Sequence, residues 1–239
     1  MLGDDEASPH RLHQLIMLVD ANAFGRRAWV QVLIDASEAG YARLYWTPTI
    51  VEEMARFRQL LWIRNWMLGG GTRLTMAVRR QLLEESNRWM DFVRPHFHVI
   101  EDKPVHTPAW SEWKPAPPEA PIWVAARQIQ VDVIVTRNLR SGPPANEGGA
   151  HVFEDVLYLD PVMLAAFLDR WGDICQTGNL IPDLTDETAD AARASVACDG
   201  DADEGEATLP PAILEFLVNV ARRRAEERAA STDEDISEP

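Results

Sequence analysis

The 239-residue sequence lacks the features of several specialised protein classes. It has only two cysteines, Cys175 and Cys198, which are too few for a disulfide framework and do not have zinc-site spacing. No apolar run approaches the roughly 20 residues that a membrane-spanning helix needs. The acidic first residues lack the basic start and apolar stretch of a secretion signal. With 46% hydrophobic and 26% charged residues, the composition is typical of a globular protein, and we expect a cytoplasmic one with no membrane partner.

Lysine is also scarce, so the positive charge comes almost entirely from arginine. The net charge is −15, of which residues 183–239 carry −11 and residues 1–182 only −4. Residues 52–94 hold eight arginines against five acidic residues. The overall acidity therefore does not exclude a nucleic-acid partner, since steering depends on the local field. The solvated face of an ordinary helix is the alternative explanation for these arginines.

Strand patterns alternate with helical patterns along most of the chain. The apolar run at 15–19 ends at Asp20 and predicts a buried strand, and Gly40 ends the helix that follows. Thr49 and Glu52 have capping-box spacing at the start of the next helix. The expected strands are residues 15–19, 41–46, 97–100, 131–136 and 151–153, and the expected helices are residues 27–39, 48–68, 72–93, 119–130 and 161–171. This order predicts an α/β fold, a three-layer α/β/α sandwich with a mostly parallel central sheet.

The ends of the chain have a different composition. We expect residues 1–13 to be disordered, 172–208 to be an acidic flexible linker and 229–239 to be a disordered tail. Residues 209–228 predict an amphipathic helix, which is marginal in water when isolated and therefore needs a partner for its apolar face. This partner could be the rest of the chain, a second copy of the chain or another protein. The acidic linker is either a solubilising appendage or a mimic of RNA that covers the arginine-rich helices.

Polar residues that could carry chemistry gather at the ends of the predicted strands and at the starts of the predicted helices. They are Asp20, Asn22, Glu52 or Glu53, Glu119 and Asn138. Taken singly, each is explained as a helix cap or as a favourable charge near a helix amino terminus. Taken together, they would converge at the carboxyl edge of a parallel sheet, where ligands bind. Such a set of hard oxygen donors predicts a Mg²⁺ or Mn²⁺ site.

Four motifs in this order resemble those of PIN domains, closest to the bacterial VapC-like branch. They are LVDANAF at 18–24, WTPTIVEEMAR at 46–56, EAPIWVAA at 119–126 and DVIVTRNL at 132–139. The resemblance covers residues 14–171 and implies a PIN-like domain there. It also implies a metal-dependent endoribonuclease that hydrolyses RNA phosphodiester bonds and leaves a 5′-phosphate.

The resemblance assigns roles to individual residues. Asp20, Glu53 and Glu119 would hold the Mg²⁺ or Mn²⁺ ion and, with Asn138, form the catalytic set, whereas Glu52 would be a capping or surface residue. The expected substrate-binding residues are Asn22, Thr136, Arg137, Arg140 and Ser141.

Two positions depart from the family pattern. Ser141 stands where many members have a further aspartate, and Pro121 stands where they often have histidine. A second metal ion would then lack a ligand, and Arg137 or Arg140 would have to stabilise the leaving oxygen. The alternative is a catalytically degenerate PIN-like module that binds RNA or protein. The resemblance further implies an antitoxin protein as a partner, and a homodimer is also considered.

Overall fold

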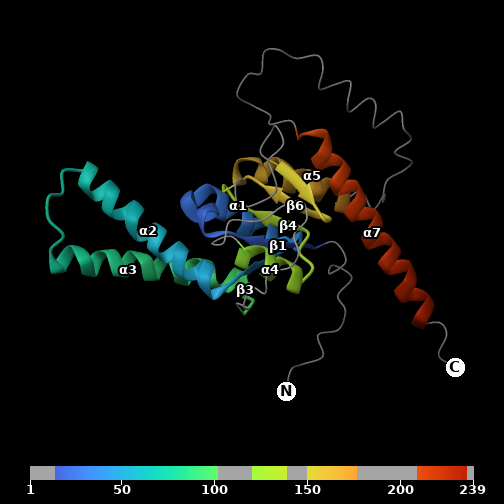
Figure 1. Cartoon of the computed structure of the whole chain (residues 1–239), viewed down its shortest axis with the longest axis horizontal. Coiled ribbons are helices and arrows are strands. Elements are labelled where there is room, and N and C mark those ends of the chain that lie inside the picture. The colour runs from blue at the N-terminus through green and yellow to red at the C-terminus, as the bar shows by residue number, and fades with distance from the viewer. Residues whose placement is uncertain (1–13, 102–119, 139–149, 177–208, 236–239) are drawn as a thin grey trace, which may run out of the picture.

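The computed structural model describes residues 14–101, 120–138, 150–176 and 209–235, and the fold is built on one six-stranded sheet (Figure 1). The strands are β1 (Leu15–Val19), β2 (Ala42–Trp46), β3 (Phe97–Val99), β4 (Val133–Val135), β5 (Ala150–Phe153) and β6 (Val156–Leu159). The helices are α1 (Arg27–Glu38), α2 (Pro48–Leu68), α3 (Met76–Val93), α4 (Ala120–Gln128), α5 (Leu164–Gln176) and α7 (Pro211–Asp235), with 3-10 turns η2 (Ala21–Gly25), η3 (Arg94–His96) and η4 (Pro161–Met163). The expectations for 1–13, for most of the linker and for 236–239 lie outside the described residues.

The strand order is β3-β2-β1-β4-β6-β5, and every neighbouring pair is parallel except β5 with β6. The predicted α/β class and mostly parallel sheet are therefore confirmed. From β1 the chain proceeds outward to β2 and β3, and it then returns to the other side of β1 with β4. The order thus reverses between β1 and β4. In open parallel sheets, a crevice opens outside the strand ends at such a reversal.

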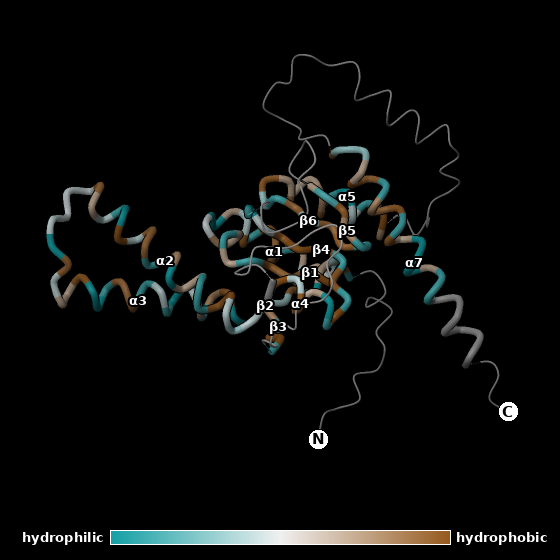
Figure 2. The backbone as a smooth tube through the Cα atoms, viewed as in Figure 1, coloured by the Kyte–Doolittle hydropathy of each residue, from teal (hydrophilic) through white to brown (hydrophobic). Residues whose placement is uncertain are grey.

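Helices cover both faces of the sheet, which is compatible with three layers. α1 and α5 contact each other on one face. α4 lies on the other face, where its Trp123 ring packs 6.4 Å from Tyr158 of β6. Right-handed crossovers require this division, because β1 to β2 and β3 to β4 step across the sheet in opposite directions. Figure 2 shows that the strands are mostly hydrophobic, which is expected when both faces are buried.

Several element boundaries differ from the sequence-based expectations. The hydroxyl of Thr47, not Thr49, caps α2 by accepting a hydrogen bond from the Ile50 amide at 3.2 Å. Helix α3 begins at Met76, after its cap Thr75, instead of at residue 72. Gly40 ends α1 as predicted, with a φ of 78° that favours glycine.

The β5–β6 hairpin is the largest difference. The sequence pattern predicts a last strand at 151–153 and no strand between it and the helix at 161–171, so β6 is not predicted. Glu154 and Asp155 form the turn with φ values of 45° and 66°. Such turns usually carry glycine or asparagine, and this hairpin has neither, so the turn signal is missing from the sequence.

The carboxyl-terminal helix is longer than predicted and packs against the body. α5 runs to Gln176, so residues 172–176 are helical and not linker, and α7 runs to Asp235, so residues 229–235 are not a disordered tail. The predicted end at Arg228 is wrong, and the two alanines that follow it are strong helix formers. α7 contacts α5 and β5, and its Ile213 and Leu217 are fully buried. The apolar face therefore has its partner within the same chain.

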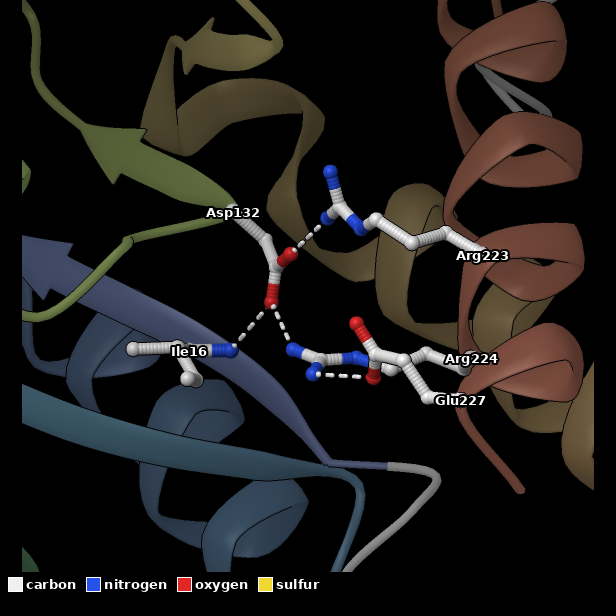
Figure 3. Close-up of polar contacts among 5 residues, drawn as sticks. All are labelled: Ile16, Asp132, Arg223, Arg224 and Glu227. Atoms are coloured by element: carbon white, nitrogen blue, oxygen red, sulfur yellow. Dashed lines mark hydrogen bonds and ion pairs between the residues drawn. The ribbon is translucent and has the colours of Figure 1, made fainter. Parts of the chain in front are cut away.

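An ion pair attaches α7 to the amino edge of the sheet (Figure 3). Asp132, which is 1% exposed, receives hydrogen bonds from Arg223 at 2.5 Å and from Arg224 at 2.9 Å. The Ile16 amide of β1 donates a third at 2.8 Å. Burial alone would lower the pKa of Arg224, but the carboxylates of Asp132 and Glu227 raise it. The buried charge of Asp132 is thus neutralised by the chain itself.

None of the described helices is long and apolar enough to cross a membrane.

We predict that Asp132→Asn lowers the free energy of unfolding by about 3 kcal/mol. This is the lower end of the range for breaking a buried ion pair, because the Arg223 side chain is 41% exposed. Urea unfolding measures the change. Asp169→Asn, at an exposed position of α5, is the control and should change stability by no more than about 0.5 kcal/mol. Equal effects of the two substitutions would contradict the role of the ion pair.

Candidate functional site

Asp20 lies at the carboxyl end of β1, where the strand order reverses. The register pairs Val19 with Val135 of β4, so Asp20 and Thr136 follow their strands side by side. The backbone amide of Asp20 donates to the Val135 carbonyl at 3.0 Å, so the hydrogen bonding between β1 and β4 continues to Asp20. Both side chains are almost completely buried. The sequence-based expectation that polar side chains converge at this edge is confirmed for the ends of β1 and β4.

Three donors hold the Asp20 carboxylate in place. Its Oδ1 accepts from the Ala21 amide at 2.6 Å. Its Oδ2 accepts from the Thr136 hydroxyl at 2.7 Å and from the Asn22 side-chain amide at 2.5 Å. These donors come from two strand ends, so the position of the carboxylate depends on the packing of β1 against β4.

Asn22 and Thr136 connect the two strand ends further. The Asn22 amide also donates to Thr136 Oγ1 at 3.2 Å, and its Oδ1 accepts from the Arg137 backbone amide at 2.7 Å. Thr136 Oγ1 accepts a second hydrogen bond from the Asn138 backbone amide at 2.9 Å. Five of the predicted site residues therefore form one hydrogen-bonded network: Asp20, Asn22, Thr136, Arg137 and Asn138.

Burial raises the pKa of the Asp20 carboxyl above its ordinary value. Its three hydrogen bonds lower the pKa but do not offset the loss of hydration. Within the described part of the chain, no arginine, lysine or histidine lies within ion-pair distance of Asp20. Asp132, which is equally buried at the opposite edge, has two arginines. Asp20 is therefore a buried carboxylate whose charge the described residues leave uncompensated.

The other predicted ligands are less closely placed. Glu53 is exposed on α2, and Glu119, Arg140 and Ser141 lie outside the described residues. Glu52 is a surface residue, as expected, 3.9 Å from Arg56. Among the residues with described positions, no three or more histidine, cysteine, aspartate or glutamate side chains form a group that could hold a metal ion. The three-carboxylate site thus stays a prediction.

The donors at this edge have the right chemistry for a hard divalent cation. The carboxylate of Asp20 and the carboxamide oxygens of Asn22 and Asn138 are ligands of the kind that Mg²⁺ and Mn²⁺ prefer. The described residues donate three hydrogen bonds to the Asp20 carboxylate, which has about four acceptor sites. The described residues thus fit part of a coordination shell, and the remaining ligands would be Glu53, Glu119 and water.

Sequence reasoning missed two features of this edge. Asp160 follows β6 and lies next to Thr136 in the register, where its carboxylate caps η4 by accepting from the Val162 amide at 2.9 Å. It was not found because the β5–β6 hairpin was not recognised. Trp29 of α1 carries two arginine side chains, Arg26 and Arg137, against its ring. The spacing of Arg26 and Trp29 is visible in the sequence, but the approach of Arg137 is not.

We predict that Asp20→Asn makes the metal-free protein at least as stable as the wild type at pH 7. The native pKa of Asp20 lies above the value of about 3.9 in an unfolded chain. Between the unfolded and the native pKa of Asp20, the native protein therefore binds more protons than the unfolded chain. The free energy of unfolding decreases as the pH rises through this range. The substitution removes this loss, so the midpoint of thermal unfolding should depend less on pH. A destabilisation as large as that of Asp132→Asn would contradict an uncompensated charge.

Compared with known proteins, the chain matches no protein-family model, no curated protein and no solved structure. The resemblance to PIN domains therefore rests on the four sequence motifs alone.

Proposed function

We propose that the protein is a metal-dependent endoribonuclease of the PIN type. One observation carries the proposal: Asp20 is buried at the strand reversal without a cationic partner among the described residues, while Asp132 is neutralised. A buried carboxylate is costly unless it is paired with a cation or coordinates a metal. A divalent cation bound at Asp20 would compensate the charge at the edge where parallel sheets bind their ligands.

In this proposal Asp20, Glu53 and Glu119 hold Mg²⁺ or Mn²⁺. Bound there, the ion would act as a Lewis acid toward the phosphodiester and would lower the pKa of the attacking water molecule. Thr136 and Asn22 donate to Asp20 and fix the direction of its carboxylate. Asn138 orients the substrate or a water molecule.

The remaining substrate contacts follow the sequence motifs. Arg137, Arg140 and Ser141 follow the end of β4 and would bind the RNA backbone, with an arginine next to the leaving oxygen. The alternative function is a PIN-like module that binds RNA or protein without cleaving it. Ser141 in place of a fourth carboxylate favours this alternative. Metal-dependent cleavage separates the two functions.

A protein partner is part of the proposal, and its docking surface is the arm formed by α2 and α3. The arm extends away from the sheet (Figure 1). Its outer part, residues 59–83, has four arginines and no acidic residue. Five large apolar side chains there are 55% to 79% exposed: Leu60, Met67, Leu68, Met76 and Leu83.

Charge decides which partner fits this outer part of the arm. Two copies would bring like charges together, which opposes a homodimer through this surface. An acidic amphipathic helix would cover the apolar side chains and neutralise the arginines. We therefore propose an acidic antitoxin-like protein as the partner.

We predict that saturating Mn²⁺ stabilises the wild type but not Asp20→Asn. At about 100 times the dissociation constant, the gain is about 2.7 kcal/mol, which thermal unfolding detects as a rise of several degrees. The same substitution should abolish Mn²⁺-dependent cleavage of single-stranded RNA.

Glu52 and Glu53 provide a matched pair for the cleavage assay, because they are adjacent and both exposed on α2. Glu53→Gln should reduce the cleavage rate at least about 100-fold, whereas Glu52→Gln should leave it unchanged. Stabilisation by Mn²⁺ without cleavage would favour the binding module. No response to Mn²⁺ in either assay would contradict the metal site.

We predict that the arm binds a designed amphipathic helical peptide with glutamates on its polar face. Leu68→Ser with Met76→Ser should weaken binding at least about tenfold, because both side chains are exposed on the arm. Val99→Ser, at an exposed apolar position of β3, is the control. Isothermal titration measures the affinity. Two results would contradict an acidic protein partner. One is a dimer in sedimentation that the double variant abolishes, and the other is binding to anionic vesicles instead of the peptide.

A further inference from the structure

Two arginine side chains lie against a single tryptophan beside the candidate site. The guanidinium of Arg26 is 5.0 Å from the centre of the Trp29 ring, and that of Arg137 is 5.2 Å from it. Trp29 is half-buried, whereas both arginines are exposed. Among the described aromatic rings, this is the one with two guanidinium groups against it.

The positions of these side chains follow from local and tertiary structure. Arg26 immediately precedes α1 and has an extended backbone, and its side chain lies over the ring of Trp29 in the first turn of the helix. Arg137 follows β4, and its backbone amide donates to Asn22 at 2.7 Å. Asn22 in turn binds Asp20. The two guanidinium groups are therefore held next to the network that positions Asp20.

The charges of Arg26 and Arg137 are not neutralised by the described part of the chain. Neither arginine has an acidic side chain within 4.0 Å there, and the first turn of α1 has no acidic residue. By contrast, Arg127, which lies over Trp123, is 3.8 Å from Glu154. An aromatic ring holds a guanidinium in place without occupying its hydrogen-bond donors, which remain available to an anion.

We infer that Arg26 and Arg137 form a site for a backbone phosphate of single-stranded RNA, with Trp29 as the residue that positions them. The inference rests on the proposed function, because it places this phosphate next to the one cleaved at Asp20. Guanidinium groups bind phosphate oxygens in pairs of parallel hydrogen bonds, and holding them on a ring reduces the entropy lost on binding. Arg26 and Trp29 thereby become part of the substrate surface.

RNA fits this site better than an acidic protein does. Arg137 is joined through Asn22 to the carboxylate of Asp20, so the guanidinium pair adjoins the place where the phosphodiester chain is proposed to bind. The apolar side chains that a protein partner would cover lie instead on the outer part of the arm.

The test measures binding of the full-length chain to a short fluorescein-labelled single-stranded RNA by anisotropy in EDTA, where no metal-dependent cleavage occurs. Arg26→Gln and Arg137→Gln should each weaken binding about tenfold, which corresponds to one charge-assisted hydrogen-bonded contact. The slope of log affinity against log salt should fall by about 0.7 when both arginines are replaced together, because the phosphate is then no longer bound by either of them. Arg43→Gln is the matched control, since Arg43 is also exposed and lies 5.5 Å from the Tyr45 ring of β2.

Trp29 is tested by a change that keeps both charges. Trp29→Leu should weaken binding with little change in the salt slope, because the arginines still bind phosphate but are no longer pre-positioned. Circular dichroism and the thermal midpoint verify that the variant is folded. Should it unfold, Arg26→Lys, which keeps the charge but cannot form paired hydrogen bonds, is expected to weaken binding with the slope unchanged.

The inference and the proposed function can fail separately. If Mn²⁺-dependent cleavage requires Asp20 but RNA affinity is the same in Arg26→Gln, Arg137→Gln and the Arg43→Gln control, the phosphate site is overturned. If RNA affinity depends on Arg26 and Arg137 but no cleavage occurs, the phosphate site stands and the nuclease proposal fails. No binding of RNA by the wild type, or equal displacement by polyglutamate and by unlabelled RNA, also overturns the phosphate site.

Discussion

The cost of burying a negative charge determines how both ends of the β1–β4 strand pair are built. Asp132 lies at the amino edge of this pair and Asp20 at the carboxyl edge, and both are almost completely buried. A carboxylate removed from water needs a partner of opposite charge or a metal ion. At the amino edge, Arg223 and Arg224 of α7 supply it. At the carboxyl edge the described residues supply only hydrogen-bond donors, which lower the pKa of Asp20, and burial raises that pKa above its ordinary value.

The amino-edge ion pair explains why α7 belongs to the folded body. The helix buries apolar residues against α5 and β5, and its two arginines reach the start of β4. Removing the chain from residue 183 onward would therefore expose core residues and leave Asp132 unpaired. Such a truncation could not distinguish an effect of the acidic segment on RNA binding from damage to the fold. Substitutions that neutralise the acidic residues at 183–206 would leave α7 in place and make this distinction.

The carboxyl edge combines a negative centre with a positive border. Asp20 is held by donors from both strand ends, and Arg137 connects this network to Trp29 and Arg26. A substrate with a phosphate backbone has groups that match both parts. Its phosphates suit the guanidinium groups, and the cation proposed at Asp20 would bring a further phosphate to the carboxylate without direct repulsion. The arm presents a different chemistry, apolar and cationic, for which we propose a different partner.

The sequence alone determined most of the elements and much of the candidate site, because both depend on local patterns. Apolar runs predicted β1 and β4, and Gly40 predicted the end of α1. The polar residues after the strand ends, Asp20, Asn22 and Asn138, were identified because the ends of parallel strands meet at one edge, whereas Thr136 came only from the resemblance to PIN domains. The β5–β6 hairpin was missed, since its turn residues, Glu154 and Asp155, are not typical of a hairpin.

Tertiary structure decided everything that depends on residues far apart in the chain. The bond from Thr136 to Asp20 joins residues 116 positions apart, and the bond from Arg223 to Asp132 spans 91. The same holds for the placement of Arg137 on Trp29. No local pattern encodes these interactions, because they depend on strand order and on which face each helix covers. The two buried aspartates look alike in the sequence, each beside an apolar strand. Only the fold makes one an internal ion pair, because α7 reaches the amino edge of the sheet, and leaves the other without a cationic partner among the described residues.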